Sequence, residues 1–210
     1  MENDIAALLL QIKAVFLSPQ TPFTWASGIQ SPIYCDNRLI LSYPDTRGQI
    51  EQGLVELITS YYPEVEAIIG TATAGIAHAA IVADKMHLPM GYVRPAVKDH
   101  GRTNQIEGFF KPKTKVVVVE DLISTGGSVI QMVDVLRLAG LQVLGIASIF
   151  TYGLAKSEEK LAQAQIVNHS LTHFQALIHV AGETGYIDKK DVAKCIAFQQ
   201  DPDNPGWMER

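Results

Sequence analysis

The sequence predicts an α/β fold in which helices cover both faces of a central, parallel β-sheet. Short runs of β-branched and apolar residues alternate along the chain with longer segments whose apolar residues recur at helical spacing. This alternation is typical of parallel sheets, because two parallel strands must be joined by a long crossover, which is usually a helix. The chain has 210 residues, a length that fits one domain with short extensions.

The N-terminal elements are expected in the following order. Apolar residues recur at helical spacing over residues 4–17, which predicts an amphipathic helix. Residues 18–38 contain three prolines and little periodicity, so we expect a loop or short strands there. A second helix is expected over residues 45–61, beginning near Pro44 and Asp45.

The alternation of strands and helices begins at residue 66. The apolar runs predict strands over residues 66–70, 90–93, 115–119, 142–150 and 164–167. The helical patterns predict helices between the TATAG segment and Met86, and over residues 127–139 and 156–163. The C-terminal segment is expected to supply packing and capping elements, with helical spacing at Leu171, Phe174, Leu177 and Ile178.

The composition argues against several classes of function. A net charge of −5 and an isoelectric point near 5.6 argue against a general binder of nucleic acid or of anionic membranes. No apolar run approaches the roughly 18 residues that a membrane-spanning helix needs. Cys35 and Cys195 occur without a CxxC spacing, and acidic residues stand near Met1 where a signal peptide would carry Lys or Arg. A reducing, cytoplasmic location is therefore expected.

The segment VVVVEDLISTGGSV, residues 116–129, combines features of two kinds of binding site. Residues 124–128 are glycines and hydroxyl residues before a predicted helix, where backbone N–H groups favour an anion. The segment is not a Walker loop, because it has no lysine, and a plain turn capped by Ser or Thr would have a similar composition. Glu120 and Asp121 favour a binding site over a plain turn, because carboxylates beside a phosphate need hydroxyls or a cation such as Mg²⁺. A ribose supplies such hydroxyls. We therefore predict a ribose 5-phosphate site.

Two further loops follow predicted strands. Residues 94–108, RPAVKDHGRTNQIEG, are either a solvated loop or a lid whose cations clamp a polyphosphate. Residues 71–75, TATAG, are either a second anion-binding loop or a tight packing turn. His169 and His173 lie four residues apart, but no third zinc ligand is nearby, so no metal site is expected there.

Three separated motifs, in matching order, resemble those of the type I phosphoribosyltransferases. VVVVEDLISTGGS resembles the signature of proteins that bind phosphoribosyl pyrophosphate. VKDHG and FTWASGIQSPIYCDNR narrow the resemblance to the orotate phosphoribosyltransferase family, over at least Phe23 to Phe150. The resemblance implies a Rossmann-like central parallel sheet flanked by helices. It also implies a single domain over residues 1–210, in which residues 1–40 form a small N-terminal hood over the pyrimidine.

The resemblance also implies roles for individual residues. Catalytic roles would fall to Lys98, His100 and Asp121. Phosphoribosyl pyrophosphate would contact Thr71, Ala72, Arg94, Lys98, His100, Glu120, Asp121, Leu122, Ile123, Ser124, Thr125, Gly126, Gly127 and Ser128. Orotate would contact Ser27, Gly28, Tyr34, Arg38 and Ser124. No residue is a certain metal ligand, although Glu120 and Asp121 could meet Mg²⁺ through the substrate.

The implied reaction transfers a phosphoribosyl group from phosphoribosyl pyrophosphate to orotate in pyrimidine synthesis, with Mg²⁺ as cofactor. The implied partner is a second copy of the chain, because in this family the loop corresponding to residues 95–108 reaches across a homodimer interface. A purine phosphoribosyltransferase and a regulator that senses phosphoribosyl pyrophosphate are alternatives, although a regulator would need a basic face. The chain departs from the family at Ala26, Gln30, Ala74 and Pro95, where relatives often carry lysine.

Overall fold

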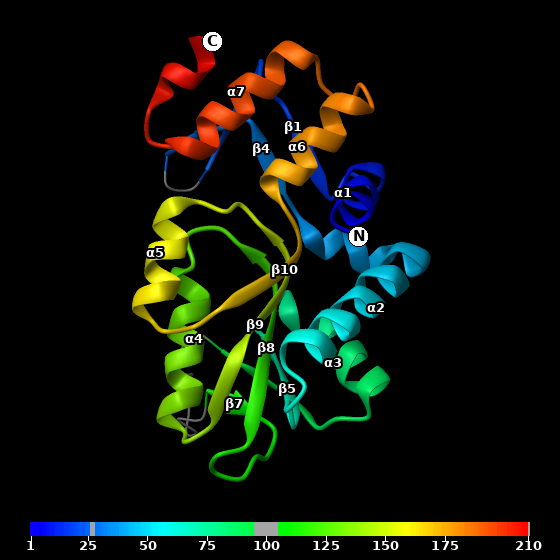
Figure 1. The fold of residues 1–210 in the computed structure, drawn as a ribbon, viewed down its shortest axis with the longest axis vertical. Coiled ribbons are helices and arrows are strands. Elements are labelled where there is room, and N and C mark those ends of the chain that lie inside the picture. Colours follow the sequence, from blue (N-terminus) through cyan, green and yellow to red (C-terminus); the bar gives the residue numbers. More distant parts are fainter. Residues whose placement is uncertain (26–27, 95–104, 210) are drawn as a thin grey trace.

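The computed structural model describes residues 1–25, 28–94 and 105–209, and a central sheet organises this part of the chain (Figure 1). The sheet order among these residues is β10-β9-β8-β5-β6-β7, and every pair is parallel except β6 with β7. The strands are β5 (Ala67–Thr71), β6 (Met90–Val93), β7 (Ile106–Glu107), β8 (Lys115–Ile123), β9 (Gln142–Thr151) and β10 (Asn168–His173). The predicted α/β class is confirmed.

Helices cover both faces of this sheet, as the alternation predicted. α2 (Pro44–Tyr61) and α3 (Gly75–Met86) lie on one face, and α4 (Gly127–Leu138) and α5 (Ala155–Gln163) lie on the other (Figure 1). Each face of the sheet therefore has its own hydrophobic core. Within β5, Ile68 packs into one of these cores and its neighbour Ile69 into the other. Both side chains are fully buried, which explains why the strands appear in the sequence as continuous apolar runs.

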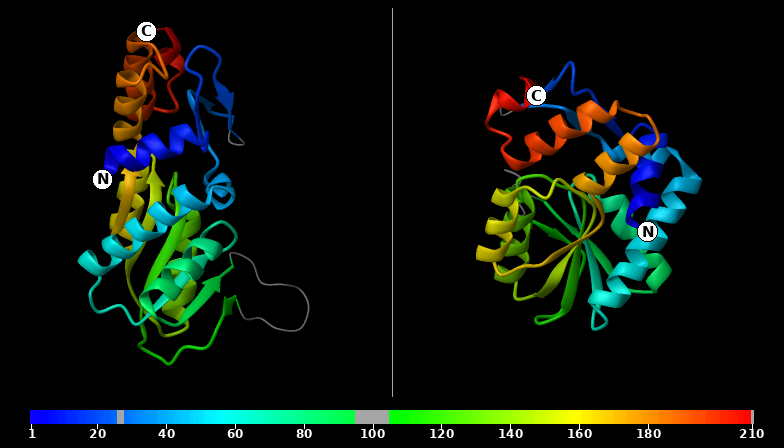
Figure 2. Two further views of the ribbon diagram at one scale, coloured as in Figure 1. Left: turned by 90° about the vertical axis from the view of Figure 1, so that its right-hand side faces the viewer. Right: turned by 45° about the horizontal axis from the view of Figure 1, so that its top comes forward.

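The two ends of the chain pack together at one end of the molecule, beyond the carboxyl ends of the strands (Figure 2). The N-terminal elements are α1 (Glu2–Gln11), β1 (Val15–Leu17), β2 (Phe23–Thr24), β3 (Gln30–Ser31), β4 (Ile33–Cys35) and the 3₁₀-helix η1 (Asn37–Ser42). The C-terminal elements are α6 (Phe174–Glu183), α7 (Lys189–Gln200) and the 3₁₀-helix η2 (Pro205–Glu209). The ring of Trp25 meets that of Phe198 edge to face, with centroids 5.8 Å apart, which joins the two groups.

Three predicted elements have bounds that differ by more than one residue in the structure. The first helix ends at Gln11 because Lys13 adopts a φ of 56°, and residues 15–17 pair with β4 instead of continuing the helix. The strand predicted over residues 115–119 continues to Ile123. The strand predicted over residues 164–167 forms at residues 168–173, so Leu171 lies in a strand and not in a helix. No helix in the described part of the chain is long and apolar enough to cross a membrane.

Candidate active site

The acid pair lies near the carboxyl end of β8, where the strand emerges from the core. Val117 and Val119 are fully buried, whereas Glu120 keeps 8% of its surface exposed and Asp121 is half-buried. In parallel sheets of this kind ligands bind beyond this edge of the strands. The extension of β8 therefore places both carboxyl groups at the edge where a ligand site is expected.

The segment after β8 turns directly into α4. Gly126 has a φ of 75°, a left-handed conformation that glycine adopts without strain, and it caps α4, whose helical residues begin at Gly127. Ser124 is half-buried, and Thr125 and Ser128 are exposed, so the hydroxyl side chains are accessible from outside. The amino end of a 12-residue helix is thus open to an anion beside the two acids.

The TATAG segment is held against the same edge by β5, the neighbour of β8. The Thr71 hydroxyl donates a hydrogen bond of 3.2 Å to the Val119 carbonyl. A side chain on Gly75 would collide with this same carbonyl and with the Thr71 hydroxyl, so only glycine allows α3 to begin so close to β8. The structure therefore brings together the predicted contacts Thr71, Ala72, Glu120, Asp121, Leu122, Ile123, Ser124, Thr125, Gly126, Gly127 and Ser128.

The acid pair carries less negative charge than its composition suggests. Burial raises the pKa of Glu120 to about 8, and the neighbouring Asp121 carboxyl group adds to the increase. The nearby Thr71 side chain offsets part of this increase in the pKa. Glu120 therefore holds its proton at neutral pH. This charge state reduces the repulsion between the pair and an anion at the start of α4.

Asn37 connects the N-terminal segment to the acid pair, although it was not among the predicted site residues. Its side chain is 1% exposed, and Nδ2 donates a hydrogen bond of 2.7 Å to the Asp121 carbonyl. The Cys35 thiol donates to Asn37 Oδ1 at 3.3 Å. Burial raises the pKa of the Cys35 thiol far above its usual range, and Asp121 and Asp36 add to this, so the thiol stays neutral. The only sequence signal was an asparagine beside Arg38 in the YCDNR motif.

The predicted orotate contacts that the structure describes in the N-terminal segment are exposed on the surface. Tyr34 is 43% exposed, and Gly28 is exposed with a φ of 87°. Arg38 is occupied by Asp36, to which its Nε and one terminal nitrogen donate at 2.6 and 2.8 Å. Asp36 and, more weakly, Asp121 raise the pKa of Arg38, which places its guanidinium within electrostatic reach of the acid pair. Ser27 lies outside the described residues.

Arg94 adjoins the TATAG segment at the next strand of the sheet. Thr71 lies opposite Val93 in the β5–β6 pairing, so Arg94 follows directly beside it. The Arg94 guanidinium forms an ion pair with Glu107 of β7, and its backbone N–H donates to the Gln105 carbonyl at 2.9 Å. The predicted catalytic residues Lys98 and His100 lie outside the described residues.

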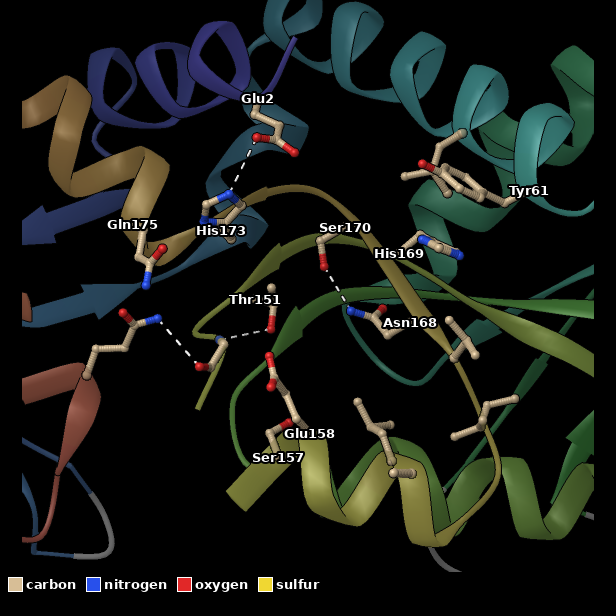
Figure 3. Close-up of a pocket in the computed structure, with 17 residues that line it drawn as sticks. Glu2, Tyr61, Thr151, Ser157, Glu158, Asn168, His169, Ser170, His173 and Gln175 are labelled. Carbon is tan, nitrogen blue, oxygen red and sulfur yellow. Dashed lines mark hydrogen bonds and ion pairs between the residues drawn. The ribbon is translucent and has the colours of Figure 1, made fainter. Parts of the chain in front are cut away.

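A separate cavity of about 600 Å³ lies along β10 (Figure 3). His169 stacks on Tyr61 with ring centroids 3.7 Å apart, and His173 approaches Glu2 at 3.4 Å. Among the described residues, no group of three or more His, Cys, Asp or Glu side chains could hold a metal ion. The residues that line this cavity include Ser157 of α5 but none of the predicted site residues around the acid pair.

Comparison with known proteins identifies the family. Residues 47–179 match the family model described as "Phosphoribosyl transferase domain". The chain is 56% identical over 208 residues to "Orotate phosphoribosyltransferase" of Bacillus cereus (strain B4264), with 99% of each chain covered. This chain therefore belongs to the phosphoribosyl transferase family, and within that family to the orotate phosphoribosyltransferases. The resemblance inferred from the three sequence motifs is confirmed.

Solved structures of similar proteins have the same fold as this chain. Orotate phosphoribosyltransferase from Aeropyrum pernix is 31% identical, has a TM-score of 0.75, and the match covers 88% of this chain and 99% of that one. Leishmania donovani UMP synthase has a TM-score of 0.80 at 24% identity, covering 94% of this chain and 42% of that one. The second likeness shows the fold alone. Together they confirm the predicted phosphoribosyltransferase fold.

Proposed function

We propose that this chain transfers the phosphoribosyl group of 5-phospho-α-D-ribose 1-diphosphate to orotate. The products are orotidine 5′-phosphate and pyrophosphate, and the reaction is a step of de novo pyrimidine synthesis. The observation that carries this proposal is the full-length similarity to orotate phosphoribosyltransferases at 56% identity. The acid pair lies directly before the open amino end of α4, and this position supports the proposal. A ribose 5-phosphate group offers hydroxyls to the acids and an anion to the helix end.

The ribose 5-phosphate part of the substrate fits this edge of the sheet. The phosphate would accept hydrogen bonds from the backbone N–H groups and hydroxyls of residues 124–128, at the positive end of α4. The ribose hydroxyls would donate to the Asp121 carboxylate and meet Glu120, whose pKa of about 8 keeps it a hydrogen-bond donor at neutral pH. Asn37 would fix the Asp121 backbone through its 2.7 Å hydrogen bond.

The reaction forms a bond between N1 of orotate and C1 of the ribose while the bond from C1 to the pyrophosphate oxygen breaks, and the proton on N1 is released to water or to the pyrophosphate. Positive charge develops on the sugar ring and negative charge on the leaving pyrophosphate. Such a reaction is accelerated by positioning and electrostatic stabilisation, without a covalent intermediate on the protein. Asp121 would stabilise the ring. Arg94, Lys98 and His100 would stabilise the pyrophosphate, and Thr71 and Ala72 would supply its backbone contacts.

The donor set fits Mg²⁺ that arrives bound to the substrate. Asp121 offers carboxylate oxygen atoms of the kind that Mg²⁺ prefers, and the described residues hold no group of three or more His, Cys, Asp or Glu side chains that would complete a site of their own. When bound, Mg²⁺ would neutralise negative charge on the pyrophosphate.

We also propose a cytoplasmic homodimer in which residues 95–108 serve the neighbouring site. Ser27, Gly28, Tyr34, Arg38 and Ser124 would contact orotate in each site.

The proposal is tested by a steady-state assay with Mg²⁺, phosphoribosyl pyrophosphate and one base at a time. We expect orotate absorbance to fall with release of one pyrophosphate per orotate consumed, and no comparable turnover of uracil, adenine or hypoxanthine. Turnover of a purine without turnover of orotate would overturn the substrate assignment. The variant Asp121→Asn serves as the control that ties the activity to this site.

A further inference from the structure

The start of α4 has a neighbour that the sequence motif does not include. α5 packs beside the first turns of α4 (Figure 1), and two of its side chains lie against Gly126 and Gly127. We propose that Ser157 and Lys160 of α5 complete the pocket for the 5-phosphate, Ser157 as a hydrogen-bond donor and Lys160 as its cation. This inference rests on the proposed function, because it assigns further residues to the same substrate.

Ser157 is a buried hydroxyl group aimed at the phosphate loop. Its side chain is 2% exposed, and Oγ has no hydrogen-bond partner among the described residues. Oγ lies 3.1 Å from the position that a Cβ on Gly126 would occupy, so it packs directly against this glycine of the phosphate loop. A buried hydroxyl without a partner costs about 1–3 kcal/mol. A phosphate oxygen bound at this loop would accept its hydrogen bond.

Lys160 places a positive charge at the positive end of a helix. Its Nζ lies 3.9 Å from the position that a Cβ on Gly127 would occupy. The Cα–Cβ direction in a helix tilts toward the amino end, so the ammonium group lies on the side of the unpaired N–H groups of α4. A cation at this end is unfavourable unless an anion lies between them.

No carboxylate in the described part of the chain provides that anion. Lys160 forms no ion pair within 4.0 Å there, although Glu158 and Glu159 precede it directly on the same helix. A phosphate dianion would satisfy the Lys160 ammonium, the helix end and the Ser157 hydroxyl together. The motif STGGS has no lysine of its own, so a cation from α5 would supply the charge that the loop lacks.

The test is calorimetric titration of ribose 5-phosphate into the wild type and variants at fixed ionic strength. We expect Lys160→Gln to weaken binding roughly tenfold, and Ser157→Ala to weaken it roughly three- to fivefold. Lys160→Arg should retain most of the affinity because it keeps the charge. Binding of pyrophosphate alone should not change in these variants. Thermal unfolding of each variant establishes that it is folded before titration.

Lys156→Gln is the matched control, because Lys156 is exposed and lies one turn earlier on the same helix. Equal losses in Lys156→Gln and Lys160→Gln would show a diffuse charge effect and would overturn the assignment. Wild-type affinity in the folded Lys160→Gln variant would overturn it as well. An equal loss of pyrophosphate binding in the Ser157 and Lys160 variants would also overturn it. Failure of the proposed function is distinguishable, because the wild type itself would then neither bind ribose 5-phosphate nor convert orotate.

Discussion

Replacing Glu120 by glutamine tests whether the acid pair holds a proton in the folded protein. Burial, with a contribution from Asp121, raises the pKa of Glu120 to about 8, above the ordinary value of 4.5. A carboxyl group with a raised pKa binds its proton more tightly in the folded than in the unfolded chain. Its contribution to the free energy of unfolding is therefore fully present below the ordinary pKa and is lost as the pH rises through 8.

The magnitude follows from these two pKa values. Between about pH 5 and about pH 9, the wild type should lose at most about 4 kcal/mol of its free energy of unfolding through this group. Relaxation of the site and entry of water reduce this bound, so we expect a loss of about 2–4 kcal/mol. Glu120→Gln cannot ionise, and its amide oxygen can still accept the Asp121 N–H, which Glu120 Oε1 accepts at 3.0 Å. The variant should therefore lack this loss.

The assay is urea unfolding of both proteins at several pH values across this range. The difference in free energy of unfolding between wild type and Glu120→Gln should shift in favour of the variant as the pH rises. Glu183→Gln, at an exposed position near the end of α6, should follow the wild type at every pH. Parallel curves for wild type and Glu120→Gln would refute the protonated, buried state of Glu120.

Three further predictions concern other residues of the proposed site. Asn37→Ala leaves the Asp121 carbonyl without its partner, so urea unfolding should show a loss of about 1–3 kcal/mol and kinetics a higher KM for phosphoribosyl pyrophosphate. Gly75→Ala places a methyl group against the Val119 carbonyl, and urea unfolding should show a loss of about 1–3 kcal/mol. Lys98→Ala should lower kcat on the order of 10²-fold if Lys98 stabilises only the transition state, as steady-state kinetics would measure.

Each of these predictions has a control or a contradicting outcome. Gly48 lies in α2 with open space around it, so the control Gly48→Ala should stabilise the protein by about 0.5–1 kcal/mol. A similar gain in stability for Gly75→Ala would contradict the proposed collision. Asn204→Ala, at an exposed position, should leave the KM unchanged. An Asn37→Ala variant with wild-type KM and stability would remove its positioning role, and an unchanged kcat in Lys98→Ala would exclude a clamping role.

The sequence predicted the core of the sheet well because strands buried on both faces are continuous apolar runs. The four valines before Glu120 are such a run, and they fix the acid pair at the carboxyl edge of β8. β10 was harder to locate because it is an edge strand with a polar sequence. Its Ser170 hydroxyl meets that of Ser148 at 2.6 Å, a cross-strand contact that no periodicity predicts.

Features that depend on contacts between distant segments could not be predicted. Asn37 and Asp121 are 84 residues apart in the chain, and their hydrogen bond exists only because η1 packs against the end of β8. The same applies to Lys160, which comes near Gly127 only through the packing of α5 on α4. The proton on Glu120 depends on how completely the folded chain excludes water from that side chain, which composition alone does not determine.

Titration calorimetry with phosphoribosyl pyrophosphate and Mg²⁺ tests most directly whether the acid pair and the loop after it form one site for this substrate. The wild type should bind one molecule per chain, and Asp121→Asn should bind at least roughly tenfold more weakly, because it loses the charged acceptor for the ribose hydroxyls. Equal affinity in the two folded proteins would show that Asp121 is not part of the substrate site.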